Sequence, residues 1–531
     1  MSAAAAATGG KPRAAAAQGD RLDPRRFAAF VFMVFGMFMA ILDIQIVSAS
    51  LSEIQAGLSA SQDEITWVQT AYLIAEVIMI PLSGYLSRAF STRTVFVVSA
   101  AGFTLMSFFC SRATSIEEMI VWRAAQGFIG GGMIPTVFAA AYTIFPRSRL
   151  ALVAPIIGLV ATLAPTVGPT AGGLLTDMFS WHWLFLVNIV PGIVVSVASW
   201  LLIDFDEPDY ALLKNFDWFG FVTMAAFLGA LEYALEEGPS KDWLESEPVT
   251  AAIVVSAIGA AAFFWRAFTA RNPIVDLRAF GNRNFWAGST LAFVLGVGLY
   301  GLTYLYPVYL ATVRGYSSLM IGDTMFVTGA CQFLTAPLTG KLVTKFDPRA
   351  VIAVGFIGFA IGTWQVSFVT ADWDFWELLV PQMFRGVSLM LCMVPINNLA
   401  LGAMPPERVK NASGLFNLMR NLGGAVGLAL INTLLDKRMD LHLERLREAV
   451  VWGRSAADET LAQLTAALAA RGSDAALAAT KEMALMVRRQ AETLALGDVF
   501  LALTALYLAL CVLPAAMRRP QAAASGGGGG H

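Results

Sequence analysis

The chain contains 531 residues, of which 57% are hydrophobic and only 14% are charged. Because soluble domains carry about 25% charged residues, this composition excludes an ordinary soluble protein and places the chain in the membrane class. A formal net charge of −2 also excludes a strongly basic nucleic-acid-binding protein.

In chain order, the first segment is an alanine-rich tail, residues 1–26. It lacks the short apolar core and small-residue cleavage site of a secretory signal, so we expect a disordered cytoplasmic tail. Apolar runs long enough to cross a bilayer, about 20 residues each, follow from Phe27 to Val512. They predict an all-α membrane protein with about fourteen transmembrane helices, near residues 27–51, 65–87, 92–111, 117–145, 150–175, 183–203, 217–236, 249–268, 286–311, 318–341, 350–370, 376–402, 411–435 and 498–516. We expect a second disordered cytoplasmic tail over residues 517–531.

Basic residues in the short connections test this count, because they accumulate on the cytoplasmic side of a membrane. On the side of the amino terminus, the connections contain Arg88, Arg93, Arg147, Arg149, Arg266, Arg271, Arg278, Arg283, Lys341, Lys345, Arg349, Arg408, Lys410, Arg518 and Arg519. The opposite short connections contain only Arg112, Lys241 and Arg314. An acidic segment at 204–209 also falls inside, but acidic residues count little in this rule. We therefore expect a multi-pass membrane protein with both termini in the cytoplasm.

A long segment, residues 436–497, separates the last two spans on the outer side. At about 60 residues it escapes the rule for short connections, so its many charges do not contradict the topology. Its apolar positions, among them Leu441, Leu446 and Leu461, fit short amphipathic helices that lie on the membrane or on a partner.

Two sets of residues repeat at one offset along the chain. Pro81-Leu82-Ser83-Gly84 corresponds to Pro337-Leu338-Thr339-Gly340, and Gly158 and Gly168 correspond to Gly414 and Gly424. Repeated halves are typical of transporters, whose substrate path lies between them. We therefore expect two six-helix bundles, residues 27–203 and 286–516, with two inserted helices in 204–270 and a cytoplasmic linker over 271–285.

Charged residues inside apolar spans are expensive and mark candidate functional sites. Asp43 in the first span and Arg123 in the fourth lie about 12 Å and about 9 Å from the outer ends of their spans, so they can pair. A neighbouring arginine favours the ionised carboxylate, and an apolar setting favours the protonated acid. This pattern predicts proton coupling by Asp43 and Arg123, with a static ion pair that packs the first half as the alternative.

Other polar residues inside the spans are candidates for the substrate cavity. Glu76, near the middle of the second span, is either protonated or faces a wet cavity, and it is a candidate for proton or cation binding. The further cavity candidates are Gln45, Gln126, Asp323, Arg385 and Asn398. Hydrogen bonding between helices is the alternative role for such residues.

Neither a metal site nor a cofactor is expected, and the proton gradient would supply the energy. All four cysteines lie in apolar runs, and the three histidines, His182, His442 and His531, are scattered. The sequence contains neither a nucleophile-elbow motif nor a metalloprotease motif, so an intramembrane enzyme or a scaffold is a remote alternative.

The fifth span contains Pro165, Gly168, Pro169, Gly172 and Gly173. Prolines bend a helix because they remove backbone donors, and glycines let a neighbouring helix approach closely. A bent, closely packed helix can rock without opening a leak, so we expect this span to support a conformational change.

Together these residues resemble the fourteen-span drug:proton antiporter branch of the major facilitator superfamily, the EmrB/QacA type, from Phe27 to Leu513. The resemblance rests on Leu42-Asp43 with Ile46-Val47, Trp67-Val68 with Thr70-Ala71-Tyr72, Arg123 with Gln126-Gly127, Gly168-Pro169 with Gly172-Gly173, and Trp181-His182-Trp183 through Phe185, Asn188 and Pro191. It implies a major facilitator fold and proton-driven export of amphipathic or cationic drugs by alternating access. It also implies that Asp43 and Arg123 serve proton coupling and that the span-five motif supports the antiport conformational change.

The connection after the second span departs from the family pattern. Gly84, Arg88 and Arg93, with Gly340 and Arg349 in the second half, are expected to act in the conformational change. However, Arg88 stands where the family has an aspartate that helps to latch the inner gate, and Ser91 stands where it has a glycine.

The resemblance further implies partners. EmrB-type relatives in Gram-negative bacteria work with a periplasmic membrane-fusion protein and an outer-membrane channel, for which segment 436–497 would be a docking surface or, alternatively, an interfacial flap. A dedicated exporter of a lipid, siderophore or other metabolite on the same fold is the alternative function.

Overall fold

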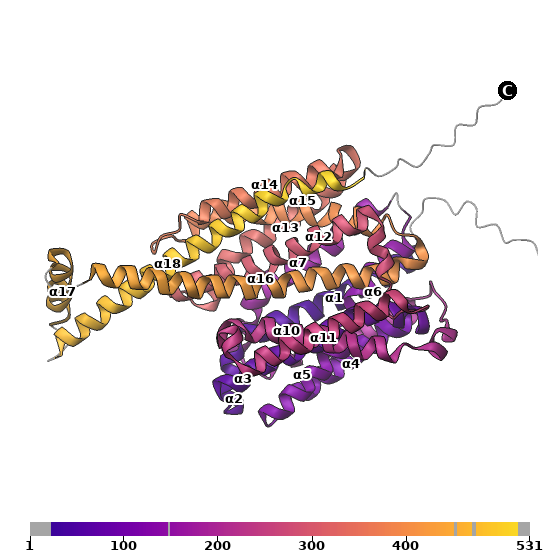
Figure 1. The fold of residues 1–531 in the computed structure, drawn as a ribbon, viewed down its shortest axis with the longest axis horizontal. Coiled ribbons are helices and arrows are strands. Elements are labelled where there is room, and N and C mark those ends of the chain that lie inside the picture. Colours follow the sequence, from indigo (N-terminus) through magenta and orange to yellow (C-terminus); the bar gives the residue numbers. More distant parts are fainter. Residues whose placement is uncertain (1–22, 147–148, 451–453, 470–473, 519–531) are drawn as a thin grey trace, which may run out of the picture.

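The computed structural model describes residues 23–146, 149–450, 454–469 and 474–518. Within these ranges, 14 helical stretches are long and apolar enough to cross a membrane. The predicted all-α architecture and the predicted number of spans are therefore confirmed. The two ends of the described chain, at Asp23 and Arg518, lie at the same end of the helix bundle, which we call the terminal side; the opposite end is the far side (Figure 1).

The helices run in the following order. They are α1 (Pro24–Ser48), α2 (Leu51–Leu58), α3 (Gln62–Phe90), α4 (Thr92–Cys110), α5 (Ile116–Gly130), α6 (Met133–Ile144), α7 (Leu150–Met178), α8 (Trp183–Leu186), α9 (Ile189–Leu202), α10 (Trp218–Glu237), α11 (Glu247–Thr269), α12 (Arg283–Val308), α13 (Ser318–Lys345), α14 (Pro348–Val366), α15 (Phe375–Leu401), α16 (Pro406–Ala449), α17 (Ser455–Leu468) and α18 (Ala475–Leu510). Two spans are divided: α5 with α6 makes the fourth, and α8 with α9 makes the sixth.

Local sequence explains where several of these helices begin. Ser61 and Glu64 form a reciprocal capping box at the start of α3, and Asp374 and Glu377 form another at the start of α15. Such boxes satisfy backbone N–H groups that have no partner inside the helix. The fourth span is divided at Gly131 and Gly132. Here Gly130, Gly131 and Gly132 are buried and pack closely against α3 and α4.

The two halves of the chain form two helical bundles that pack on each other. α1 to α9 make the first, and α12 to α16 with α18 make the second (Figure 1). The sequence repeat relates α3 to α13 and α7 to α16, and the structure packs α3 on α16 and α7 on α13. A twofold-like relation between repeated halves requires this exchange of partners.

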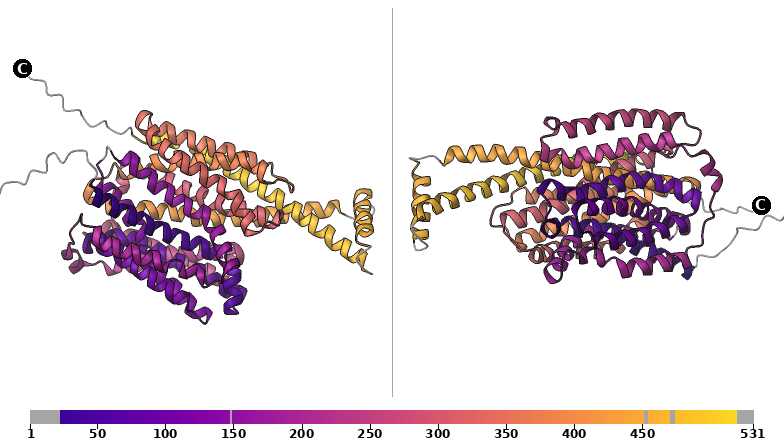
Figure 2. Two further views of the ribbon diagram at one scale, coloured as in Figure 1. Left: turned by 180° about the vertical axis from the view of Figure 1, so that it is seen from behind. Right: turned by 90° about the horizontal axis from the view of Figure 1, so that it is seen from below.

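The inserted helices α10 and α11 pair with each other at the edge of this assembly, and α10 also packs on α3 and α16 (Figure 2, right). The ring of Tyr233 on α10 stacks on Trp67 of α3, with 5.5 Å between the ring centroids. Beyond the end of α10, the indole N–H of Trp243 donates to the Thr433 hydroxyl of α16 at 2.9 Å. The first inserted helix is thus attached to both bundles.

The segment between the last two spans differs from the prediction. Instead of short helices lying on a surface, α16 and α18 continue beyond the far side of the bundle as two long helices, and α17 packs at their end (Figures 1 and 2). Asp498 joins the two helices, because its carboxylate accepts from Arg438 and His442, each at 2.6 Å. The predicted span ended at residue 435, where charged residues begin, but the next residues to 449 contain neither proline nor glycine. Charge ends the membrane-crossing part, whereas only a helix breaker ends the helix.

Candidate functional site

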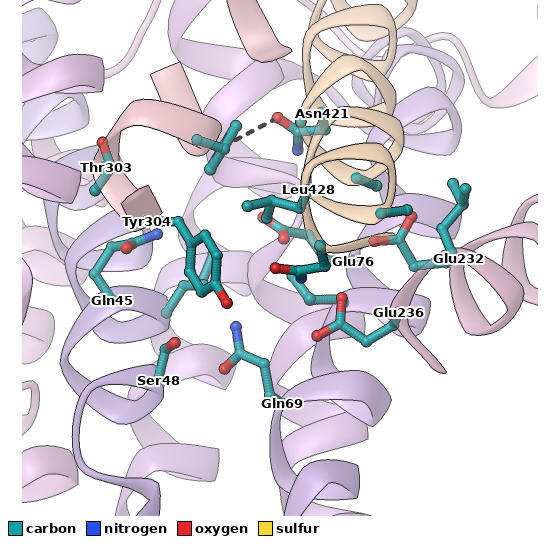
Figure 3. Close-up of a pocket in the computed structure, with 18 of the residues that line it drawn as sticks. Gln45, Ser48, Gln69, Glu76, Glu232, Glu236, Thr303, Tyr304, Asn421 and Leu428 are labelled. Carbon is teal, nitrogen blue, oxygen red and sulfur yellow. Dashed lines mark hydrogen bonds between the residues drawn. The ribbon is translucent and has the colours of Figure 1, made fainter. Parts of the chain in front are cut away.

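A cavity of about 380 Å³ lies between the two bundles. Residues from α1, α3, α7, α10, α12 and α16 line it (Figure 3). It occupies the far half of the protein, because α1, α10 and α12 run away from the terminal side and contribute residues near their far ends. Its position between the repeated halves is where transporters bind their substrates.

The lining combines apolar and aromatic surface with an unbalanced set of charges. Three carboxylates, Glu76, Glu232 and Glu236, line the cavity, and none of the described residues that line it is basic. Tyr300 and Tyr304 of α12 supply aromatic rings, and the Tyr300 hydroxyl donates to Asn421 at 3.5 Å. Glu76 is 97% buried, and its Oε1 atom has no hydrogen-bond partner among the described residues. Such a lining attracts cations and offers them a flat apolar surface.

A second polar cluster lies inside the first bundle, on another face of α1. Asp43 and Arg123 are fully buried, and an Arg123 guanidinium nitrogen lies 2.6 Å from Asp43 Oδ2. The other oxygen, Oδ1, accepts from the Asn188 side-chain amide at 2.7 Å and from Gln126 at 3.4 Å. Arg123 also donates to the Val68 carbonyl at 3.2 Å. The predicted pairing of Asp43 with Arg123 is therefore present in the structure.

This cluster adjoins the cavity through α1. Ile44 and Gln45 line the cavity, whereas Asp43, the preceding residue, faces the interior of the first bundle. On the far half of α1, Gly172 of α7 approaches so closely that a Cβ atom there would lie 2.7 Å from the Ile46 carbonyl oxygen. Gly168 likewise faces the Gln45 side chain. A movement of α1 relative to α7 would therefore reshape the cavity wall.

The two bundles touch each other on the terminal side. Lys410, at the start of α16, forms an ion pair with Asp206 in the connection after α9 and donates to the Ser87 carbonyl at 3.0 Å. Asp206 is held in place because it accepts from the backbone N–H and the hydroxyl of Thr92, both at 2.7 Å. The Ser413 hydroxyl donates across the interface to a carbonyl of α6 at 2.7 Å. These contacts join the two bundles on the terminal side, while the cavity lies in the far half.

Of the residues predicted to act in the conformational change, the three arginines contact groups within their own half of the protein. Arg88 lies over the ring of Tyr85, and Arg93 lies over the ring of Trp200, both within the first half. In the second half, Arg349 pairs with Asp347 at 2.8 Å. Gly84 does lie at the interface, where an added Cβ atom would be 2.8 Å from the Lys410 carbonyl oxygen. Gly340 lies within α13, and Pro165, Pro169 and Gly173 lie within α7.

Of the predicted cavity residues, only Gln45 and Glu76 line the cavity. Gln126 instead belongs to the Asp43 cluster, where it accepts from Arg123 at 2.7 Å, and Asp323 is exposed on α13. Arg385 donates to the Thr303 hydroxyl at 2.7 Å, behind the cavity wall. Asn398 accepts from Tyr142 at 3.2 Å on the terminal side. Depth in the membrane is readable from a sequence, but the face of a helix that borders a cavity depends on its neighbours.

Sequence analysis did not single out Glu232 and Glu236. The signal was present, because two carboxylates four residues apart inside an apolar run are expensive unless they face a cavity or a partner. They lie on α10, one of the helices inserted between the repeated halves, and only the tertiary structure brings α10 to the cavity.

Comparison with known proteins identifies this arrangement. Residues 33–428 match the family description "Major Facilitator Superfamily". The chain is 44% identical over 473 residues to the colistin resistance protein EmrB of Acinetobacter baumannii, covering 89% of this chain and 92% of that protein. It is 28% identical to the multidrug export protein EmrB of Escherichia coli K12, over 80% of this chain and 84% of that protein. The fold is similar to that of the human organic anion transporter MFSD10, with a TM-score of 0.56 at 11% identity over 92% of this chain and 100% of that one.

Proposed function

The chain belongs to the major facilitator superfamily, in its EmrB-type multidrug-efflux branch, and on this basis we propose that it is a proton-coupled antiporter which exports amphipathic cations across the bacterial inner membrane by alternating access. It is a transporter and not an enzyme. The terminal side would face the cytoplasm and the far side the periplasm, as the positions of the basic residues predict.

One observation carries this proposal: a fully buried ion pair joins Arg123 of α5 to Asp43 of α1, the helix that also forms a wall of the cavity. A buried carboxylate is stable as an anion only while its cationic partner remains in place. Protonation of Asp43 would leave Arg123 as an uncompensated buried charge, at a cost of about 3–5 kcal/mol. The first bundle can lower this cost by moving α1 relative to α5, and that movement would alter the cavity.

The cavity supports cations as the exported class. Three carboxylates with no basic residue in the lining would attract positive charge, and two tyrosine rings would contact the apolar body of an amphiphile. The contacts on the terminal side, together with a cavity in the far half, fit a state that is closed to the cytoplasm. Rupture of the Lys410–Asp206 contact would open the other side.

The α16–α18 extension supports a further part of the proposal, a periplasmic partner. It projects on the far side of the bundle, where a membrane-fusion protein would meet it (Figure 1). Exposed leucines such as Leu477 and Leu485 lie on its surface and provide apolar contact area.

Transport by the purified protein in proteoliposomes tests the proposal. A pH gradient imposed across the membrane should drive accumulation of a quaternary ammonium probe against its concentration gradient, and substrate addition should speed collapse of the pH gradient. If neither flux depends on the other, proton-coupled antiport is wrong for this protein.

A further inference from the structure

Helix α10 contributes two acidic residues to the cavity from outside the two repeated bundles. Glu232 and Glu236 are four residues apart, which places them on one face of the helix. Glu232 is 94% buried, and both side chains line the cavity. Figure 3 shows them on the same side of the cavity as Glu76 of α3. Three carboxylates thus gather where α10 covers the gap between α3 and α16.

The negative charge of this group is not balanced by ion pairs. Glu76, Glu232 and Glu236 form no ion pair among the described residues, and one oxygen of the almost fully buried Glu76 has no hydrogen-bond partner. Two buried arginines interact electrostatically with Glu76 without bonding to it. Arg123 binds Asp43, and Arg420 donates to the neutral Asn417 at 2.8 Å, so they offset only part of the charge of the group. Three anions cannot share so small an apolar space without protons or cations from outside the chain.

The position of α10 is fixed by contacts to both halves. Tyr233, one residue beyond Glu232, stacks on Trp67 of α3, and Trp243 beyond the helix end bonds to Thr433 of α16. Gly229 of α10 also faces α3, since a Cβ atom there would be in van der Waals contact with the side chains of Ile74 and Ile78 at 3.4 Å. The two carboxylates are therefore presented to the cavity by a firmly packed helix.

We propose that the inserted helix α10 completes the substrate site, and that Glu232 and Glu236 bind a second positive charge of the substrate while Glu76 faces the first. The protein then prefers amphiphiles with two positively charged groups to those with one. This inference rests on the proposed export of cations but not on its coupling to protons.

The neighbouring Glu237 supplies a matched control. It lies one residue from Glu236 on α10 but outside the cavity lining, and it pairs with Lys241 at 2.8 Å. The hydrogen bond from Lys241 to Glu237 raises the pKa of Lys241 above its ordinary value. Loss of Glu237 therefore removes an acidic residue from the same helix without removing one from the cavity.

Binding measurements on the purified full-length protein test the inference. The probes are decyltrimethylammonium, with one charge, and decane-1,10-bis(trimethylammonium), with a second charge on the same chain. Titration calorimetry in detergent should give tighter binding of the doubly charged probe to the wild type. In the double variant Glu232→Gln and Glu236→Gln, the preference for that probe should fall about tenfold or more, because attraction between a unit charge and a carboxylate in a partly buried cavity contributes at least about that factor. Glu237→Gln should keep the preference.

Each outcome has a distinct meaning. An equal loss of affinity for both probes in the double variant, an unchanged preference, or a wild type without preference would overturn the inference. Retained binding of the singly charged probe shows that the variant is folded. If the preference changes as expected but a pH gradient drives no transport, the proposed proton coupling fails and the role of α10 stands.

Discussion

Replacing Asp43 with Asn removes the negative charge from the buried pair. The new side-chain amide has nearly the shape of the carboxylate and keeps one oxygen that can accept from Arg123. The variant therefore resembles a permanently protonated aspartic acid. Arg123 is fully buried, and apart from Asp43 it bonds only to neutral groups, the Val68 carbonyl and Gln126. An uncompensated buried charge costs about 3–5 kcal/mol. The bundle would settle in whichever conformation reduces this cost.

The size of the effect follows from that bias. At the lower limit, about 3 kcal/mol leaves the other conformation populated at roughly one part in 100 to 200. Because each export cycle must visit both conformations, uphill transport should fall at least about 100-fold. Probe binding should be weakened far less, since the side chain of Asp43 does not line the cavity.

Proteoliposomes with an imposed pH gradient provide the assay, with probe accumulation as the measured quantity. Asp323→Asn is the matched control, because it removes the same charge from an exposed site on α13 and should transport like the wild type. Calorimetric binding of the probe checks that the Asp43 variant is folded. Accumulation by Asp43→Asn at the wild-type rate would refute the coupling role of this carboxylate.

Three other perturbations address the interface, the α1–α7 contact and the far-side extension. Lys410→Met should loosen the terminal side because it removes the ion pair to Asp206, so alkylation of cysteines introduced there should become faster. Arg408→Met loses only a half-exposed contact of 3.9 Å to Asp276, and it should leave the alkylation rate near that of the wild type. Gly172→Val should slow transport and lower stability by about 1–3 kcal/mol in a thermal unfolding assay, because a Cβ atom cannot fit beside α1, while Gly281→Val meets no neighbour within 4 Å. Deleting α17 should reduce drug resistance of cells more than probe transport in proteoliposomes, since the extension lies outside the cavity.

Each of these expectations has a contradictory result. Equal alkylation rates in Lys410→Met and Arg408→Met would show that the Lys410 contact does not hold the terminal side closed. Wild-type transport by the Gly172 variant would mean that close packing of α1 on α7 is not required. Equal losses in cells and in proteoliposomes after deletion of α17 would indicate a structural role for the extension instead of partner binding.

Much of the architecture was readable from the chain alone. Fourteen apolar runs, interrupted by charge, predict fourteen crossing helices because each helix satisfies its own backbone in the bilayer and must be apolar over its length. The pairing of Asp43 with Arg123, 80 residues apart, could be predicted because both lie at a similar depth in their membrane spans. The repeat of Pro81 and Gly84 at Pro337 and Gly340 likewise predicted two related bundles.

Tertiary structure alone decided which faces of these helices meet. It put Gln126 beside Asp43 instead of in the cavity. It also paired Lys410 with Asp206 between the bundles on the terminal side, although the sequence marked these residues only for their charge. It also brought Glu232 of an inserted helix to the wall between the two bundles. Depth and helicity are properties of a contiguous segment, whereas a cavity wall is shared by six helices distant in sequence, and its composition depends on how each helix is rotated by its neighbours.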